Sequence, residues 1–109
     1  METAKLIEAT CPECRGPLTD VVEGEIHEYS CLVGHRYSAL GVLRAHSETQ
    51  ERTLWAAVLV LEESANLTST IGPQFGPEVQ GRLHLQTEKK LRQAAQIREI
   101  LKELEPFSV

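Results

Sequence analysis

The sequence predicts a small α+β fold, in which a β-hairpin flanked by two cysteine-bearing turns precedes a long antiparallel helical hairpin. Residues 1–38 are dense in turn formers and short alternating segments. Residues 39–71 contain no proline, and their apolar side chains recur at intervals of three and four, which is helical spacing. We therefore expect two domains, over residues 1–38 and 39–109.

The predicted β-hairpin has one strand at residues 19–23 and a second at residues 26–31. Apolar and polar side chains alternate in the second segment, as they do in a half-buried strand. Gly24 and Glu25 are expected to form the tight connection between the strands. Such a hairpin returns the chain to its starting point, so the turns before and after it should meet.

The predicted helices run over about residues 39–71 and 77–105. Ser38 is a candidate N-cap for the first helix, and Pro77 suits the first turn of the second. Pro106 is expected to end the second helix. Because the two helices have similar lengths and a loop of about six residues joins them, we expect them to pack antiparallel.

A metal-binding pattern spans the two turns of the β-hairpin. Two residues separate Cys11 from Cys14, sixteen lie between Cys14 and Cys31, and three separate Cys31 from His35. Zinc prefers four soft or borderline ligands in a tetrahedron, and a two-residue gap lets two thiolates of one turn reach the same ion. We predict that these four residues bind one structural Zn²⁺ and that residues 1–38 form a zinc ribbon.

Two alternatives to this ligand set remain. His27 competes with His35 as the fourth ligand, because it lies only four residues before Cys31 in the second strand and its side chain can face either side. His35 is preferred because it lies on the second turn. The other alternative is three buried free cysteines without a metal, which leaves the hairpin without an obvious core.

We expect no enzymatic activity from this chain, and no cofactor other than zinc. Four protein ligands leave no open position on the ion, whereas catalytic zinc keeps one. The Pro-Cys-x-x-Cys element of zinc deaminases is absent, because Pro12 lies inside the cysteine pair. Glu13, between the same cysteines, is interpreted as a solvated turn residue. The sequence also contains no Gly-x-Ser-x-Gly elbow and no phosphate loop.

The charge distribution disfavours a nucleic-acid partner. Residues 1–38 carry seven acidic and three basic side chains, a net charge of −4, and residues 39–109 carry nine acidic and eight basic ones, a net charge of −1. A nucleic-acid-binding zinc ribbon of a transcription-type regulator is the alternative function, but its metal-binding half would have the wrong sign for phosphate.

An apolar belt over residues 54–61 is the longest uninterrupted apolar run. It is far shorter than the roughly 20 residues of a membrane span, and residues 1–10 do not resemble a secretory signal. We therefore expect a cytoplasmic protein without membrane association. The belt is apolar around the whole helix, which exceeds the stripe that one helical partner can cover. The predicted interaction surface consists of Leu54, Trp55, Val58, Leu59 and Leu61.

Three partners can cover this surface. The zinc ribbon can fold back on it, another protein can dock there, or two copies can form a four-helix bundle on dimerisation. We favour the homodimer, because the zinc ribbon is joined to the helix some fifteen residues before the belt, roughly 22 Å along the helix axis.

Several segments together resemble one bacterial module. They are Cys11-Pro-Glu-Cys-Arg-Gly-Pro-Leu, Tyr29-Ser-Cys-Leu-Val-Gly-His-Arg-Tyr-Ser and Thr53-Leu-Trp-Ala-Ala-Val-Leu-Val-Leu-Glu-Glu. The chain from about residue 9 to 104 resembles the zinc-ribbon and helical-hairpin segment at the C-terminus of some chemotaxis-type protein-glutamate methylesterase homologues. The catalytic α/β domain of that family has no counterpart here. The resemblance implies an accessory module of bacterial chemosensory signalling, with the same zinc ligands and a coiled-coil-like pair of helices.

Overall fold

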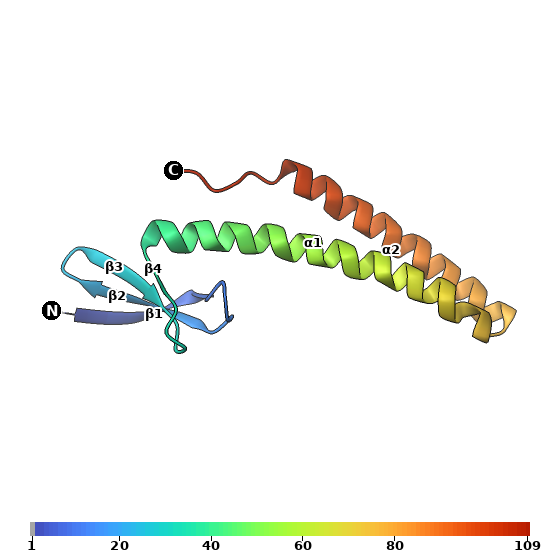
Figure 1. Cartoon of the computed structure of the whole chain (residues 1–109), viewed down its shortest axis with the longest axis horizontal. Coiled ribbons are helices and arrows are strands. Elements are labelled where there is room, and N and C mark those ends of the chain that lie inside the picture. The colour runs from blue at the N-terminus through green and yellow to red at the C-terminus, as the bar shows by residue number, and fades with distance from the viewer. Residues whose placement is uncertain (1) are drawn as a thin grey trace. The chain divides into compact units, whose positions relative to one another are not determined.

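The computed structural model describes residues 2–109 and confirms the small α+β fold (Figure 1). An antiparallel four-stranded sheet with the order β1-β2-β3-β4 comes first, and two long helices follow. The elements are β1 (Glu2–Thr10), β2 (Pro17–Glu23), β3 (Ile26–Ser30), β4 (Arg36–Tyr37), α1 (Ala39–Ile71), the short 3₁₀ helix η1 (Gly72–Gln74) and α2 (Pro77–Glu103).

The β-hairpin predicted from the sequence is formed by β2 and β3. The two strands pair antiparallel from Thr19 opposite Ser30 to Glu23 opposite Ile26. Gly24 begins the two-residue connection with a φ of +64°, a conformation that glycine adopts without a steric cost. The hairpin therefore brings the residues before β2 close to those after β3.

Strands β1 and β4 were not expected from the sequence. β1 pairs antiparallel with β2, and its register shifts between Leu6 and Thr10. The side chains from Glu2 to Leu6 are all exposed, so the first part of this edge strand lacks the alternation that reveals a strand with one buried face. Only Ile7 and Ala9 are partly buried between exposed residues. β4 has only two residues, which is too short for any periodic signal.

The predicted helix boundaries hold closely. The backbone N–H of Gly41 donates a hydrogen bond to Ser38 Oγ at 3.0 Å, which confirms Ser38 as the N-cap of α1. Helix α2 begins at Pro77 as expected but ends at Glu103, two residues earlier than the sequence suggested. Leu104 is extended. Pro106 disfavours the helical conformation at Glu105, the residue before it, and has no N–H to donate to the last turn.

The described chain divides into two compact units. One contains the sheet, the chain up to Thr49 and residues 106–109, and the other contains residues 50–105. The first unit therefore includes the first turns of α1, beyond the boundary after Ser38 that the sequence suggested.

Two hydrogen bonds connect these first turns of α1 to the sheet unit. His46 Nε2 lies 2.8 Å from the carbonyl oxygen of Thr10, and Thr49 Oγ1 donates to the carbonyl oxygen of Pro12 at 3.4 Å. The buried cluster of this unit draws on the sheet, its turns and the helix, and it consists of Cys11, Leu18, Cys31 and Val42. Because two of its four members are cysteines, the hydrophobic core of this unit is small.

The second unit is an antiparallel helical hairpin in which α1 and α2 lie side by side (Figure 1). Its buried residues are small or branched, with Val58, Ala65 and Ala94 almost without exposed surface. Lys90 Nζ donates to Ser64 Oγ at 2.8 Å across the pair of helices. None of the helices within residues 2–109 is long and apolar enough to cross a membrane.

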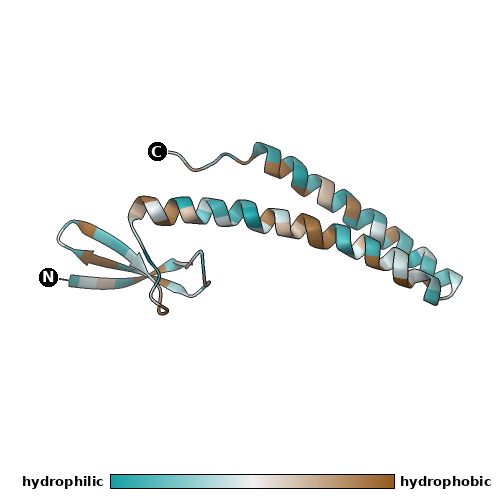
Figure 2. Cartoon of the chain, viewed as in Figure 1, coloured by the Kyte–Doolittle hydropathy of each residue, from teal (hydrophilic) through white to brown (hydrophobic). Residues whose placement is uncertain are grey.

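Packing in the helical hairpin covers only part of the apolar belt of α1, which Figure 2 colours as hydrophobic. Val58 is fully buried against the hairpin partner, so its inclusion in an exposed interaction surface is corrected. Leu54 and Leu61 are half-buried, whereas Leu59 keeps 55% of its surface exposed and Trp55 keeps 43%. The physical reason is geometric, because a helical partner covers only one stripe of an all-round apolar belt.

Arg98 of α2 partly covers the exposed ring of Trp55. Its guanidinium carbon lies 5.5 Å from the Trp55 ring centroid, and its Nη2 donates to Glu62 Oε1 at 2.8 Å. The guanidinium can therefore make a cation–π contact with the Trp55 ring and at the same time remain paired with the Glu62 carboxylate.

Candidate metal centre

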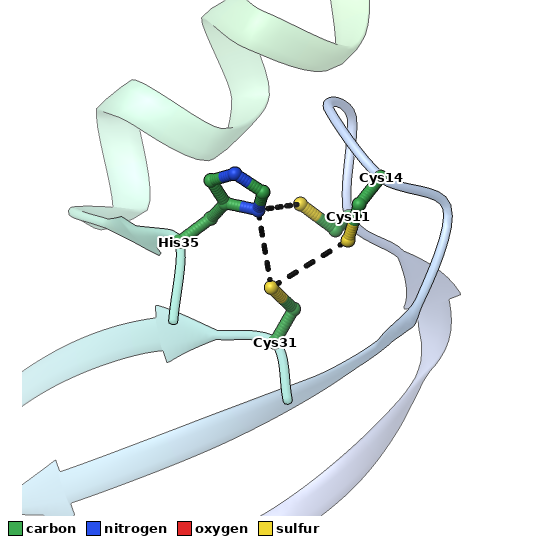
Figure 3. A group of neighbouring side chains, drawn as sticks. All are labelled: Cys11, Cys14, Cys31 and His35. Atoms are coloured by element: carbon green, nitrogen blue, oxygen red, sulfur yellow. Dashed lines mark hydrogen bonds between the residues drawn. The ribbon is translucent and has the colours of Figure 1, made fainter. Parts of the chain in front are cut away.

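The structure brings Cys11, Cys14, Cys31 and His35 together between the two turns (Figure 3). One donor atom from each residue lies within 4.8 Å of the other three, so the group can hold one metal ion. The sulfurs of Cys14 and Cys31 are 3.6 Å apart, and His35 Nδ1 lies 3.3 Å from Cys31 Sγ and 3.6 Å from Cys11 Sγ. All three cysteines are free thiols.

The first turn places two of the sulfurs. The N–H of Cys11 donates to the carbonyl oxygen of Gly16 at 2.7 Å, and the N–H of Arg15 donates to the carbonyl oxygen of Cys11 at 2.9 Å. Arg15 has a φ of +64°, which closes the turn tightly. A Cβ on Gly16 would lie 3.4 Å from Cys14 Sγ, so glycine leaves room for the backbone to pass behind the sulfur.

The second turn places the other sulfur and the imidazole. The N–H of Cys31 donates to the carbonyl oxygen of His35 at 3.1 Å, and the N–H of Gly34 donates to the carbonyl oxygen of Cys31 at 3.2 Å. Gly34 has a φ of +112°, which L residues rarely adopt. This glycine lets three intervening residues fold back so that the side chains of Cys31 and His35 point to the same centre.

The geometry favours His35 over His27 as the fourth ligand. The Nδ1 atom of His27 pairs with the carboxylate of Asp20 at 2.9 Å, and its ring stacks on Tyr29 with centroids 6.3 Å apart. It therefore lies on the sheet surface, outside the cysteine cluster. The sequence left this choice open because a strand residue can face either side.

Hydrogen bonds favour the metal-binding protonation state of Cys31. Burial acts to raise its pKa, but the backbone N–H groups of His35 and Gly34 and the side chains of Cys14 and His35 outweigh burial and lower that pKa to about 6. The hydrogen bond to Cys31 in turn raises the pKa of His35 against the effect of burial, and the charge of Glu13 adds to the rise.

The other two thiols differ from each other. Burial acts to raise the pKa of Cys11, but hydrogen bonds from the backbone of Cys14 and from Tyr37 lower it overall. The Gly16 backbone N–H lowers the pKa of Cys14, but partial desolvation and the neighbouring Cys31 and Cys11 thiols together outweigh it and raise that pKa overall. Neighbouring thiolates repel one another, so the three thiols resist losing their protons together. A bound cation offsets this repulsion and allows all three to be deprotonated.

Two residues beside the cluster were missed or misread from the sequence. Glu13 Oε2 lies 2.9 Å from His35 Nε2, on the ring nitrogen that faces away from the sulfurs, so Glu13 is more than a solvated turn residue. The Tyr37 hydroxyl lies 3.6 Å from Cys11 Sγ. Burial, followed by Cys11 and Glu13, raises the pKa of Tyr37, so this hydroxyl stays protonated. No spacing rule covers either residue, because both contacts depend on how the two turns meet.

The remaining histidines, His46 and His84, lie on helices. His46 contacts the Thr10 carbonyl from α1, and His84 pairs with Glu88 within α2 at 3.3 Å.

Comparison with protein-family models, curated proteins and solved structures finds no match for this chain.

Proposed function

We propose that the four-residue cluster holds one Zn²⁺ ion and that this ion is structural. Zinc binds sulfur at about 2.3 Å and imidazole nitrogen at about 2.0–2.1 Å, so a tetrahedral site needs neighbouring donor atoms about 3.4–3.8 Å apart. The contacts of Cys31 with Cys14 and His35, and of Cys11 with His35, are 3.3–3.6 Å long. The convergence of these donors from two separate turns is the observation that carries the proposal.

A structural ion fits the small core of the sheet unit. Cys11 and Cys31 are buried beside Leu18 and Val42, so the metal would cross-link both turns next to the only buried apolar cluster described there. Domains of this size gain much of their stability from such cross-links, because they bury too little apolar surface. Four protein ligands leave no position for a reacting water, which supports a non-catalytic role.

Metal content in purified and zinc-reconstituted protein tests this proposal. We expect one zinc per chain in the wild type by elemental analysis and native mass spectrometry. Cys14→Ser removes a ligand whose side chain is exposed, so it should reduce zinc binding without opening a cavity in the core. His35→Ala should also reduce binding, whereas His27→Ala should keep one zinc. A reconstituted wild type without zinc, or loss of zinc only in His27→Ala, would contradict the proposal.

We also propose that the helical hairpin mediates self-association and that a second copy of the chain is the partner. The proposal is supported by the exposed side chains of Trp55 and Leu59, which form the part of the predicted interaction surface that α2 leaves uncovered. Residues 50–105 carry eight acidic and seven basic side chains, so two hairpins would meet with little net repulsion. Two such pairs of helices can form a four-helix bundle.

Light scattering after size-exclusion chromatography tests this association. We expect a dimer for the wild type and a shift toward the monomer for Leu59→Glu, because a carboxylate would be buried in the apolar contact. Leu85→Glu makes the same change at a residue of α2 that is 65% exposed, and it should leave the dimer intact. A wild type that remains monomeric at its highest soluble concentration would contradict self-association.

The wider role follows from these two parts. A zinc-stabilised ribbon with an associating helical hairpin suits an accessory or regulatory module, which agrees with the resemblance to the C-terminal segment of methylesterase homologues. We propose bacterial chemosensory signalling as its setting on the basis of that resemblance alone. A nucleic-acid-binding role is disfavoured, because residues 1–38, which contain the cluster, have a net charge of −4.

A further inference from the structure

The two ring nitrogens of His35 have different partners: Glu13 contacts one, and the cysteine sulfurs contact the other. Oε2 of Glu13 lies 2.9 Å from Nε2, while Nδ1 lies 3.3 Å from Cys31 Sγ and 3.6 Å from Cys11 Sγ. Figure 3 shows Nδ1 directed toward the sulfurs and the other ring nitrogen directed away from them. The carboxylate and the cluster therefore contact opposite edges of one imidazole.

This division fixes which nitrogen can bind a metal. An ionised carboxylate can only accept hydrogen bonds, so the Nε2 atom that faces Glu13 must carry the proton. A neutral imidazole has one proton, and its Nδ1 atom then presents a lone pair to the cluster. Metal-binding histidines commonly donate their second N–H to a carboxylate, which sets the tautomer and the orientation of the ring.

We propose that Glu13 is a positioning residue that selects Nδ1 of His35 as the fourth metal ligand and strengthens metal binding. The inference rests on the proposed zinc site and adds the ligand atom and its orienting partner. Glu13 is one of the two residues between Cys11 and Cys14. The two-residue spacing by itself does not require any particular residue type at that position.

The burial of the two intervening residues supports this role. Pro12 is buried, and its carbonyl oxygen accepts the hydrogen bond from Thr49, so the turn is anchored to α1. Glu13 has a side chain that is 58% exposed, and its partner His35 has one that is 32% exposed. A charged surface contact this exposed contributes little to folding by itself. Its effect should therefore appear in metal affinity, and it should reach the stability of the fold only through the bound metal.

Zinc affinity of Glu13 variants, measured by competition with a chromophoric chelator, tests the inference. Glu13→Ala should weaken zinc binding by about 10–100-fold, which is the usual effect of losing the partner of a metal-binding histidine. Glu13→Gln keeps an oxygen that can accept from Nε2, so its affinity should lie much closer to the wild type. Glu28→Ala is the matched control, because it removes another exposed carboxylate of the same unit, 48% accessible, that pairs with Arg36 instead.

Nitrogen-15 spectra of the His35 ring supply a second readout, which a merely structural role of Glu13 would not change. We expect a metal-bound Nδ1 and a protonated Nε2 in the wild type and in Glu13→Gln, and an altered Nε2 signal in Glu13→Ala. Metal binding through Nε2, or wild-type affinity in Glu13→Ala, would overturn the inference and leave the zinc site standing. A wild type without zinc would instead overturn the proposed function.

Discussion

Individual residues in the two turns matter through backbone conformation as much as through their side chains. Gly34 adopts a φ of +112° between Cys31 and His35, and Gly24 adopts a φ of +64° at the tip of the β-hairpin. A Cβ at either glycine would meet no atom within 4 Å, so any cost of substitution comes from the backbone itself. Substitutions at these two glycines therefore allow backbone strain beside the metal cluster to be compared with backbone strain elsewhere in the same unit.

We predict that Gly34→Ala weakens zinc binding and lowers the free energy of unfolding by about 1–3 kcal/mol, because an L residue is strained at this φ. Gly24→Ala should cost about 1–2 kcal/mol, since the left-handed conformation is less restricted, and should lower zinc affinity less than Gly34→Ala does, because Gly24 lies away from the ligands. Denaturant unfolding and chelator competition measure the two effects. Equal zinc affinity in both variants would show that the second turn tolerates the strain.

At the level of elements, the two helices start in different ways and contain glycines with different roles. Helix α1 is capped by Ser38, and Gly41 allows this cap because a Cβ there would lie only 2.9 Å from Ser38 Oγ. Helix α2 starts at Pro77 without a side-chain cap, and a Cβ added at its exposed Gly81 would meet no atom within 4 Å. Gly41 is therefore required by a contact, whereas Gly81 is not.

We predict that Gly81→Ala raises the free energy of unfolding by about 0.5–1 kcal/mol, because alanine loses less backbone entropy in a helix. Gly41→Ala should gain nothing, since the new methyl displaces the Ser38 hydroxyl and the lost cap costs about 1 kcal/mol. Chemical denaturation followed by circular dichroism compares them. Stabilisation of similar size in both variants would mean that the cap has no energetic role.

At the level of the whole chain, the two compact units have cores of different chemistry. The sheet unit combines Leu18 and Val42 with two of the metal-binding cysteines. The helical hairpin packs Val58, Ala65 and Ala94 and contains none of the four residues of the cluster. Removal of a metal should therefore affect the units unequally.

We predict that a strong zinc chelator unfolds the sheet unit and leaves most of the helical signal. Amide resonances of β2 and β3 should lose their dispersion, while far-ultraviolet circular dichroism keeps most of its helical intensity. Readdition of zinc should restore the dispersed spectrum. Complete loss of helical signal on chelation would show that the hairpin depends on the metal.

The sequence by itself determined the features that are encoded locally. Helix limits follow from Ser38, Pro77 and the spacing of apolar residues, and the β2–β3 hairpin follows from alternation around Gly24. The candidate ligands follow from cysteine spacing, because tight turns restrict which side chains can meet.

The tertiary structure decided the features that depend on contacts between distant segments. It assigned β1 to the sheet although the exposed residues from Glu2 to Leu6 show no alternation, and it placed His35 rather than His27 in the cluster. It also buried Val58 in an otherwise uniform apolar belt and brought Glu13 to the far edge of the His35 ring. Each of these features depends on which side of a residue is covered by a segment distant in the sequence. The spacing of residues along the chain does not contain that information.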